Sequence, residues 1–100
     1  MHHSKIRLEK PTNQHALVIY LLLERGKKGI NTFEAIKDCY FYKITARVSE
    51  LISKYELNVH KKQEKFTNRF GHKGQTTRYC LYESDLQKNL DIYKKVNSKK

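Results

Sequence analysis

Eight consecutive apolar residues, Ala16 to Leu23, lie near the start of a chain that is otherwise rich in charge. Asn13 or Thr12 is a suitable N-cap before them and Arg25-Gly26 a suitable end, so the run predicts a helix. A helix that is apolar all round must be covered on more than one side. The run is far shorter than the roughly 20 residues that span a bilayer, and no signal peptide is visible. We therefore expect one soluble cytoplasmic domain with this helix in its core, and no membrane partner.

Two further helices are predicted after a brief strand at Lys28-Gly29-Ile30. Asn31 and Glu34 have the spacing of a capping box, in which the asparagine caps the helix and the glutamate reaches back. This second helix is expected to end near Cys39, and a tight turn leads to a third helix over residues 42–55. The apolar positions of the third helix recur at helical spacing on one face: Ile44, Val48, Leu51, Ile52 and Tyr55.

A β-hairpin is predicted next. Residues 57–61 alternate between apolar and polar side chains, and residues 77–82 are rich in β-formers. The segment between them is basic and contains two glycines, which predicts a long, jointed tip. Phe66 and Phe70 lie in this charged segment, and we expect them to pin the hairpin to the body of the protein.

A last helix is predicted over residues 84–96, because Ser84 and Gln87 repeat the capping-box spacing. Two features favour a homodimer through the first and last helices. The first helix has more apolar surface than one small core should cover, and the last helix carries an apolar stripe of Leu86, Leu90 and Tyr93. The alternative is that the last helix completes the core of a monomer. Residues 97–100 are expected to be a disordered tail.

The order helix, short strand, helix, turn, helix, hairpin, helix predicts an α+β fold that is mainly α. It is the order of a winged helix-turn-helix domain, with a three-helix core, a β-hairpin wing and here an extra C-terminal helix. We expect that domain over residues 12–83. Residues 1–11, with Lys5, Arg7 and Lys10, are expected to form a flexible basic arm.

Two stretches of the chain resemble a known family. They are Asn31-Thr-Phe-Glu-Ala-Ile and Cys39-Tyr-Phe-Tyr-Lys-Ile-Thr-Ala-Arg-Val-Ser-Glu-Leu51. It is the small winged helix-turn-helix domain family of phage, prophage and mobile-element DNA-binding proteins. The match covers about residues 14–82, and the run Ala46-Arg47-Val48 is its most specific feature. Family members often have a glycine near the end of the third helix, where this chain has Tyr55-Glu56, and their wing is shorter and less basic. The resemblance implies a DNA-binding regulator of transcription, replication or recombination.

The charge of the chain favours a polyanionic partner. The 21 Lys and Arg residues against 10 Asp and Glu residues give a net charge of +11, and the pI is about 9.7. From His60 to Arg78 the chain has six Lys and Arg residues and one acidic residue, Glu64. Such a field attracts double-stranded DNA, and each exposed cation can neutralise a phosphate. The predicted phosphate contacts of the wing are Lys61, Lys62, Lys65, Arg69, Lys73 and Arg78. For Phe66 and Phe70 the alternative to anchoring the hairpin is that one of the rings wedges at a base step.

The third helix is the predicted recognition helix. Its outer face carries small side chains, which allow a helix backbone to approach base edges in the major groove. Arg47 lies near the edge of the buried face, so it either reads a base or pairs with Glu34 or Asp38. The predicted contacts of this helix are Tyr42, Lys43, Thr45, Ala46, Arg47 and Ser49.

Other functions have less support from the sequence. No nucleophile–base pairing, phosphate-binding glycine loop or carboxylate cluster is visible, so we expect no enzyme, no small-molecule substrate and no cofactor. The histidine and cysteine spacings match no metal site, and Cys39 and Cys80 are expected to be reduced and partly buried. The alternative function is a winged-helix protein-interaction module, such as a phage inhibitor or adaptor of a host protein. RNA binding ranks third, and a DNA-binding role implies association with the nucleoid.

Overall fold

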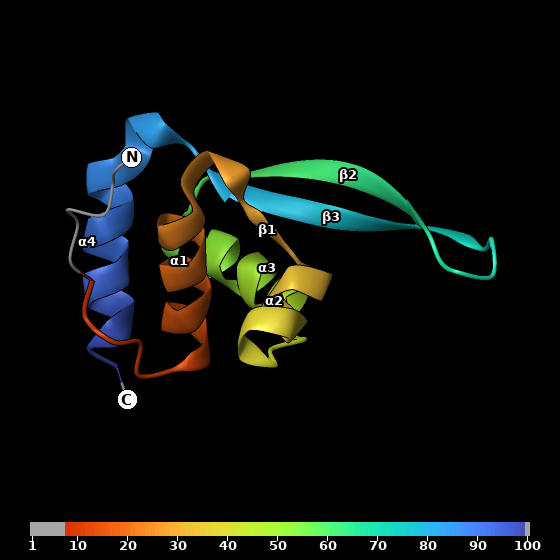
Figure 1. Ribbon diagram of the computed structural model, residues 1–100. Coiled ribbons are helices and arrows are strands. Elements are labelled where there is room, and N and C mark those ends of the chain that lie inside the picture. Colours follow the sequence, from red (N-terminus) through yellow and green to blue (C-terminus); the bar gives the residue numbers. More distant parts are fainter. Residues whose placement is uncertain (1–7, 100) are drawn as a thin grey trace.

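The structure, a computed structural model, describes residues 8–99 and is α+β, mainly helical, as the sequence predicts. In chain order it contains α1 (Gln14–Arg25), β1 (Ile30–Asn31), α2 (Thr32–Cys39), α3 (Ile44–Tyr55), β2 (Val59–Thr67), β3 (Lys73–Leu81) and α4 (Leu86–Asn97), with 3₁₀ turns at Gly26–Lys28 and Glu83–Asp85. The helices form a body from which β2 and β3 project as a long hairpin (Figure 1). This order is compatible with the predicted winged helix.

The three strands form an antiparallel sheet in the order β1-β3-β2. Ile30 of β1 pairs with Tyr79 of β3, and β2 pairs with β3 along its whole length, from Val59 opposite Leu81 to Thr67 opposite Lys73. The hairpin strands are longer than the sequence predicted, and the loop between them is correspondingly short, residues 68–72. The prediction was wrong because the outer half of β2 carries almost no apolar side chains, so it lacks the alternation that marks a strand.

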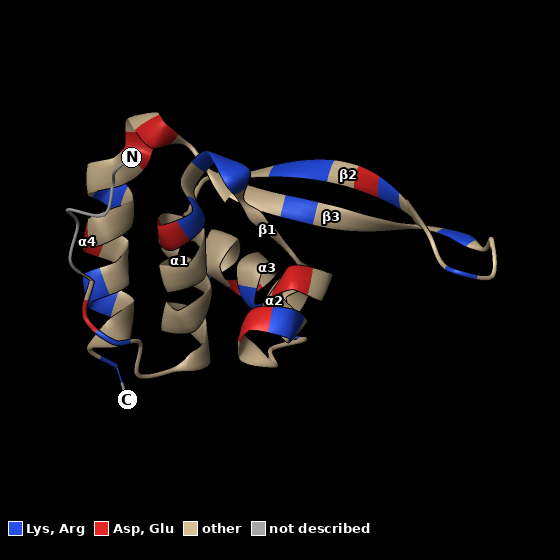
Figure 2. Ribbon diagram, in the orientation of Figure 1, with Lys and Arg blue, Asp and Glu red and all other residues tan. Residues whose placement is uncertain are grey.

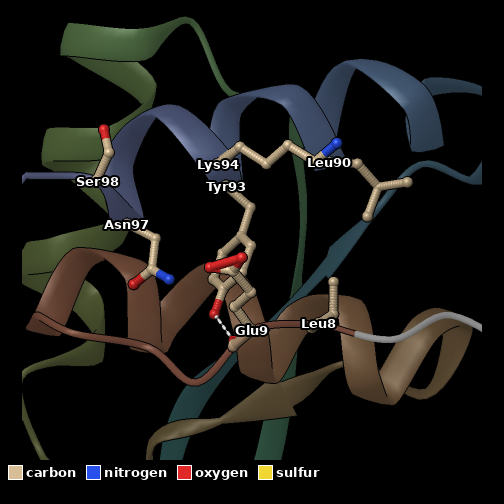
Figure 3. A pocket seen from close by; sticks show the side chains of 7 residues that line it. All are labelled: Leu8, Glu9, Leu90, Tyr93, Lys94, Asn97 and Ser98. Carbon is tan, nitrogen blue, oxygen red and sulfur yellow. Dashed lines mark hydrogen bonds between the residues drawn. The ribbon is translucent and has the colours of Figure 1, made fainter.

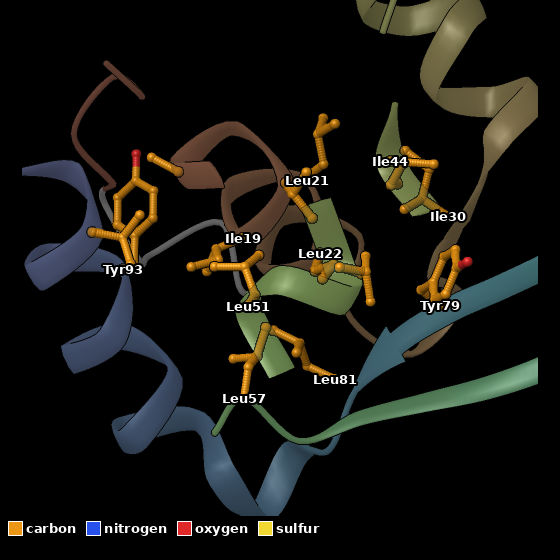
Figure 4. Close-up of a cluster of buried hydrophobic side chains, with 14 of the residues drawn as sticks. Ile19, Leu21, Leu22, Ile30, Ile44, Leu51, Leu57, Tyr79, Leu81 and Tyr93 are labelled. Carbon is orange, nitrogen blue, oxygen red and sulfur yellow. The ribbon is translucent and has the colours of Figure 1, made fainter. Parts of the chain in front are cut away.

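The core is built around α1. Its residues Ala16, Val18, Ile19, Leu21 and Leu22 are buried, and α3, α4 and β3 all contact it. Figure 4 shows the side chains of these elements converging on α1; the largest contributors from other elements are Ile44, Leu51, Leu57, Tyr79, Leu81 and Tyr93. The prediction that α1 is covered on more than one side is confirmed. Its apolar surplus is covered within the protomer, so it no longer argues for a dimer.

Two of the three predicted helix N-caps are confirmed. The Asn13 side chain accepts a hydrogen bond from the Ala16 amide at 2.8 Å. Asn31 accepts from the Glu34 amide at 2.9 Å while the Glu34 carboxylate accepts from the Asn31 amide, which completes the predicted capping box. The start predicted at Ser84 is wrong, since residues 83–85 form a 3₁₀ turn and α4 begins at Leu86 without a side-chain cap.

The segment before α1 lies against α4. The Tyr93 hydroxyl donates a hydrogen bond to the Glu9 carbonyl, and the Asn97 amide group donates to the Lys10 carbonyl at 3.1 Å. Thr12 donates to Asn97 in return, from its backbone amide at 2.7 Å. The described part of the predicted flexible arm, residues 8–11, is therefore held in place, while Lys5 and Arg7 lie outside the described residues. Asn97 was predicted to begin a disordered tail but is the buried last residue of α4.

Within residues 8–99, two residues other than glycine have a left-handed backbone, Tyr40 with φ 54° and Glu56 with φ 56°. Glu56 follows the last turn of α3, and its amide donates to the Leu51 carbonyl. This is the C′ position that glycine favours, because a Cβ atom is strained in this conformation. The departure from the resembled family, in which a glycine is common near this point, therefore leaves α3 with a strained end.

We expect Glu56→Gly to raise the free energy of unfolding by about 1 kcal/mol, because the glycine relieves the strain of the left-handed conformation. Urea titration followed by circular dichroism measures the change. The matched control is Lys94→Gly on the exposed side of α4, where a glycine in a helix interior is expected to cost about 1 kcal/mol. A loss of stability in Glu56→Gly would contradict the prediction.

Candidate nucleic-acid interface

The outer face of α3 carries small side chains. Ile44, Val48 and Leu51 are buried, whereas Thr45, Ala46, Ser49 and Ser53 are exposed. The exposure follows from the helical period, since residues opposite a buried stripe must face away from the core. The predicted geometry of α3 is confirmed, and four short side chains lie where a partner can approach the helix backbone.

The turn before α3 is also exposed. Phe41 is buried and anchors the turn, while Tyr42 is 67% exposed and Lys43 lies beside it, with its ammonium 5.9 Å from the ring centroid. Both residues were predicted at the leading end of the recognition helix. They are accessible there, next to the first turn of α3.

Arg47 lies on the flank of α3 that faces the N-terminus of α1. Its guanidinium donates to Gln14 at 2.9 Å and to Glu50 at 2.8 Å. The partners suggested from the sequence, Glu34 and Asp38, are wrong, because α2 lies elsewhere and both carboxylates pair with Arg25. Arg47 therefore ties α3 to α1, at the edge of the exposed face.

The hairpin has two chemically different faces. Side chains alternate along a strand and directly paired residues share a face, so the strand register assigns each residue. One face begins with Tyr79 and Leu81, which pack in the core, and Tyr79 donates a hydrogen bond from its hydroxyl to the Thr45 hydroxyl of α3 at 3.0 Å. We call it the α3-side face; beyond Tyr79 it carries Lys61, Gln63, Lys65, Thr67, Lys73, Gln75 and Thr77.

The α3-side face is cationic and contains no acidic residue along β2 and β3. Lys61, Lys65 and Lys73 are exposed and make no ion pair with any carboxylate of residues 8–99. Figure 2 shows basic residues spaced along the hairpin out to its end. Because Tyr79 joins this face to Thr45, the lysines continue from the exposed side of α3.

The opposite face of the hairpin contains Lys62 and Arg78. Arg78 donates two hydrogen bonds to the Glu34 carboxylate at 2.9 Å each and one to Glu64 at 2.7 Å. Asn31 donates to the second oxygen of Glu64 at 3.1 Å. These four residues, the Arg78 cluster, join β3, β2 and the start of α2. Arg78 was predicted to contact phosphate; its guanidinium is instead occupied by two carboxylates, which the sequence did not reveal because Glu34 lies 44 positions away.

The two phenylalanines of the hairpin have different surroundings. Phe66 packs edge-on against Phe33 of α2, with 5.1 Å between ring centroids, so its predicted role as an anchor is confirmed. Its cross-strand partner Gly74 leaves room for the ring. Phe70 is 70% exposed at the tip, so the same prediction is wrong for that ring. Phe33 was missed as a hairpin contact because the two rings lie far apart in the sequence.

A hollow of about 500 Å³ lies between the N-terminal segment and α4, away from the hairpin (Figure 3). Its described lining consists of Leu8, Glu9, Leu90, Tyr93, Lys94, Asn97 and Ser98. Neither histidine nor cysteine is among these lining residues. Between residues 8 and 99, three or more histidine, cysteine or carboxylate side chains do not gather into a group that suits a metal ion. Over the same range, every helix is too short or too polar to cross a bilayer.

Several other predicted features can be placed. Tyr93 is 2% exposed, so of the proposed dimer stripe only Leu86 and Leu90 reach the surface. Cys39 is exposed and Cys80 half-buried, both as free thiols. No family model, curated protein or solved structure matches the chain. The family resemblance therefore remains a prediction.

The Arg78 cluster makes stability depend on pH. The hydrogen bonds from Arg78 hold the pKa values of Glu34 and Glu64 below their ordinary value of 4.5. A carboxyl whose pKa is lower in the folded chain stabilises the fold above its ordinary pKa, and this contribution is lost as the pH falls through the folded value. Acid should therefore weaken the attachment of the hairpin to α2.

We expect the free energy of unfolding of the wild type to fall between about pH 5 and about pH 3. It should fall less in Glu34→Gln, which removes one of the titrating carboxyls. Urea titrations at both pH values measure the difference. Glu24→Gln, on the exposed side of α1 and outside the cluster, should keep the wild-type pH dependence. Identical pH dependence in Glu34→Gln and the wild type would contradict the role of the cluster.

Proposed function

We propose that this chain is a winged helix-turn-helix protein that binds double-stranded DNA, with α3 in the major groove and the hairpin as the wing. The order of elements and the sheet order β1-β3-β2 support the fold assignment. The observation that carries the function is the Tyr79–Thr45 contact, which joins the small exposed face of α3 to the cationic α3-side face of the hairpin. Shape and charge thus meet on one side of the molecule.

Each half of this surface has its own task. The short side chains of Ala46 and Ser49 let the α3 backbone approach base edges; Ser49 hydrogen-bonds to a base and Ala46 contacts a thymine methyl group. Thr45 accepts from Tyr79 through its hydroxyl, so its methyl group can also contact thymine. Lys43 leads the helix into the groove next to a phosphate.

The hairpin supplies affinity without sequence preference. Lys61, Lys65 and Lys73 contact phosphates, with Arg69 of the tip at the margin of the surface, whereas Lys62 lies on the opposite face of the hairpin. Since Arg78 is occupied by carboxylates, about five cations remain when Lys43 is included, and log affinity should fall with log salt at a slope of about −4 to −5. By its resemblance to phage and mobile-element proteins, the chain would regulate transcription, replication or recombination, as a cytoplasmic protein associated with the nucleoid.

We expect Lys65→Gln/Lys73→Gln to weaken duplex binding and to make the salt slope shallower by about 2, because two phosphate contacts are lost. Fluorescence anisotropy on a labelled duplex at several salt concentrations measures both quantities. The matched control Lys88→Gln/Lys95→Gln removes the same charge from α4, at two exposed positions outside the stripe of Leu86 and Leu90. If both variants bind like the wild type, or both weaken equally, the hairpin is not the DNA contact.

A second candidate function, a module that binds another protein, has one observation in its favour. Phe33 and Ile36 of α2 and Tyr40, which directly follows the helix, are 52%, 40% and 90% exposed. Exposed apolar patches occur at protein interfaces. The anisotropy titration described above separates the two functions. Weak duplex binding that changes neither with salt nor with the lysine substitutions favours a protein partner.

We also propose a homodimer through the exposed side of α4, where Leu86 is 41% exposed and Leu90 is half-buried. A two-fold dimer would present two copies of α3 to DNA sites about one helical turn apart. Sedimentation equilibrium at micromolar concentration should return twice the chain mass, and Leu86→Glu/Leu90→Glu should return the 12.0 kDa of one chain. A wild-type mass of 12.0 kDa would refute the dimer and leave the DNA surface of each protomer intact.

A further inference from the structure

The tip of the hairpin is a turn with defined hydrogen bonds. The Asn68 side chain accepts from the Phe70 amide at 2.9 Å and from the His72 amide at 3.0 Å. The backbone of Asn68 accepts from the Gly71 amide and donates to the His72 carbonyl, both at 2.9 Å. Gly71 has φ 84°, which completes the turn. The backbone of the tip therefore has a defined turn conformation.

Phe70 is the large apolar side chain of this turn, and it is 70% exposed. Its neighbours are the guanidinium of Arg69, 4.7 Å from the ring centroid, and the ring of His72 at 6.5 Å. Phe66, in the same hairpin, packs against Phe33 of α2 and is 38% exposed, about half the exposed fraction of Phe70. Phe70 contributes little apolar burial to the fold and remains available to a partner.

The tip is far enough from α3 to reach a different groove. Tyr79 contacts Thr45 at the first turn of α3, and the strand runs from there to Lys73 over six residue steps. At about 3.3 Å per residue this span is about 20 Å. One turn of B-DNA is about 34 Å, so the centres of neighbouring major and minor grooves are about 17 Å apart along the axis. With α3 in the major groove and the hairpin directed along the DNA axis, the tip would reach the adjacent minor groove.

We propose that Phe70 is a wedge that enters this minor groove, unstacks a base step and bends the duplex. This inference rests on the proposed function. From Lys65 to Tyr82 the sequence contains no acidic residue, so the tip meets no repulsion from phosphates. Arg69 beside the ring suits the negative potential of a narrow minor groove, and an inserted apolar ring partly unstacks the step and kinks the helix.

The test compares DNA bending by the wild type, Phe70→Ala and Phe70→Leu. A duplex of about 30 base pairs carries a donor and an acceptor dye at its ends, and energy transfer is measured with the protein in saturating amounts. We expect binding of the wild type to bend the duplex by about 20–90°, which shortens the distance between its ends and raises the energy transfer between the two dyes. Phe70→Ala should bind with most of this bend lost, and Phe70→Leu should keep most of it, because leucine also acts as a wedge.

Two controls make the outcomes distinguishable. His72→Ala changes the other ring of the tip and should bend DNA like the wild type, and thermal unfolding should show that no variant loses stability. Binding without bending by the wild type, or equal bending by Phe70→Ala, overturns the wedge and leaves the proposed function standing. Wild-type binding to single strands but not to duplex, lost in Phe70→Ala, overturns both and makes the ring a stacking platform.

Discussion

The burial of α1 is the constraint on which the rest of the structure depends. Because its central turns have no polar face, α3, α4 and β3 must all turn apolar side chains toward it. Because the apolar face of α3 is turned toward α1, the small side chains on its opposite face are exposed. For β3 it directs Tyr79 and Leu81 inward, and strand alternation then puts Lys73 on the same face farther out. One hydrophobic requirement thus determines where the candidate DNA surface lies.

The basic residues of the hairpin are of two kinds: Arg78, which is paired with carboxylates in the Arg78 cluster, and the lysines of the α3-side face, which are exposed. Arg78 is held by Glu34 and Glu64, so its charge is neutralised inside the protein and fixes the hairpin on α2. The contact between Phe66 and Phe33 reinforces this attachment farther along the strand. The lysines of the α3-side face keep their charge available to solvent and to a polyanion. A count of basic residues does not separate these roles, since both kinds contribute equally to the net charge.

Local sequence patterns predicted what local interactions determine. The caps at Asn13 and Asn31 and the buried stripe of α3 were all correct, because a cap and a helical stripe involve residues only a few positions apart. The failures have a shared cause. The outer hairpin lacks apolar alternation, and the Ser84 pattern competes with a 3₁₀ turn, so neighbours in space outweighed the local signal.

The sequence by itself determined the number, order and inner faces of the helices, and a strongly basic segment before the last of them. It did so because hydrophobic period and capping act within one or two helical turns. Only the tertiary structure decided that Arg78 meets Glu34, that Tyr79 meets Thr45, and that Phe66 packs against Phe33 while Phe70 is 70% exposed at the tip. These outcomes depend on strand register and on packing between distant segments, which no short pattern records.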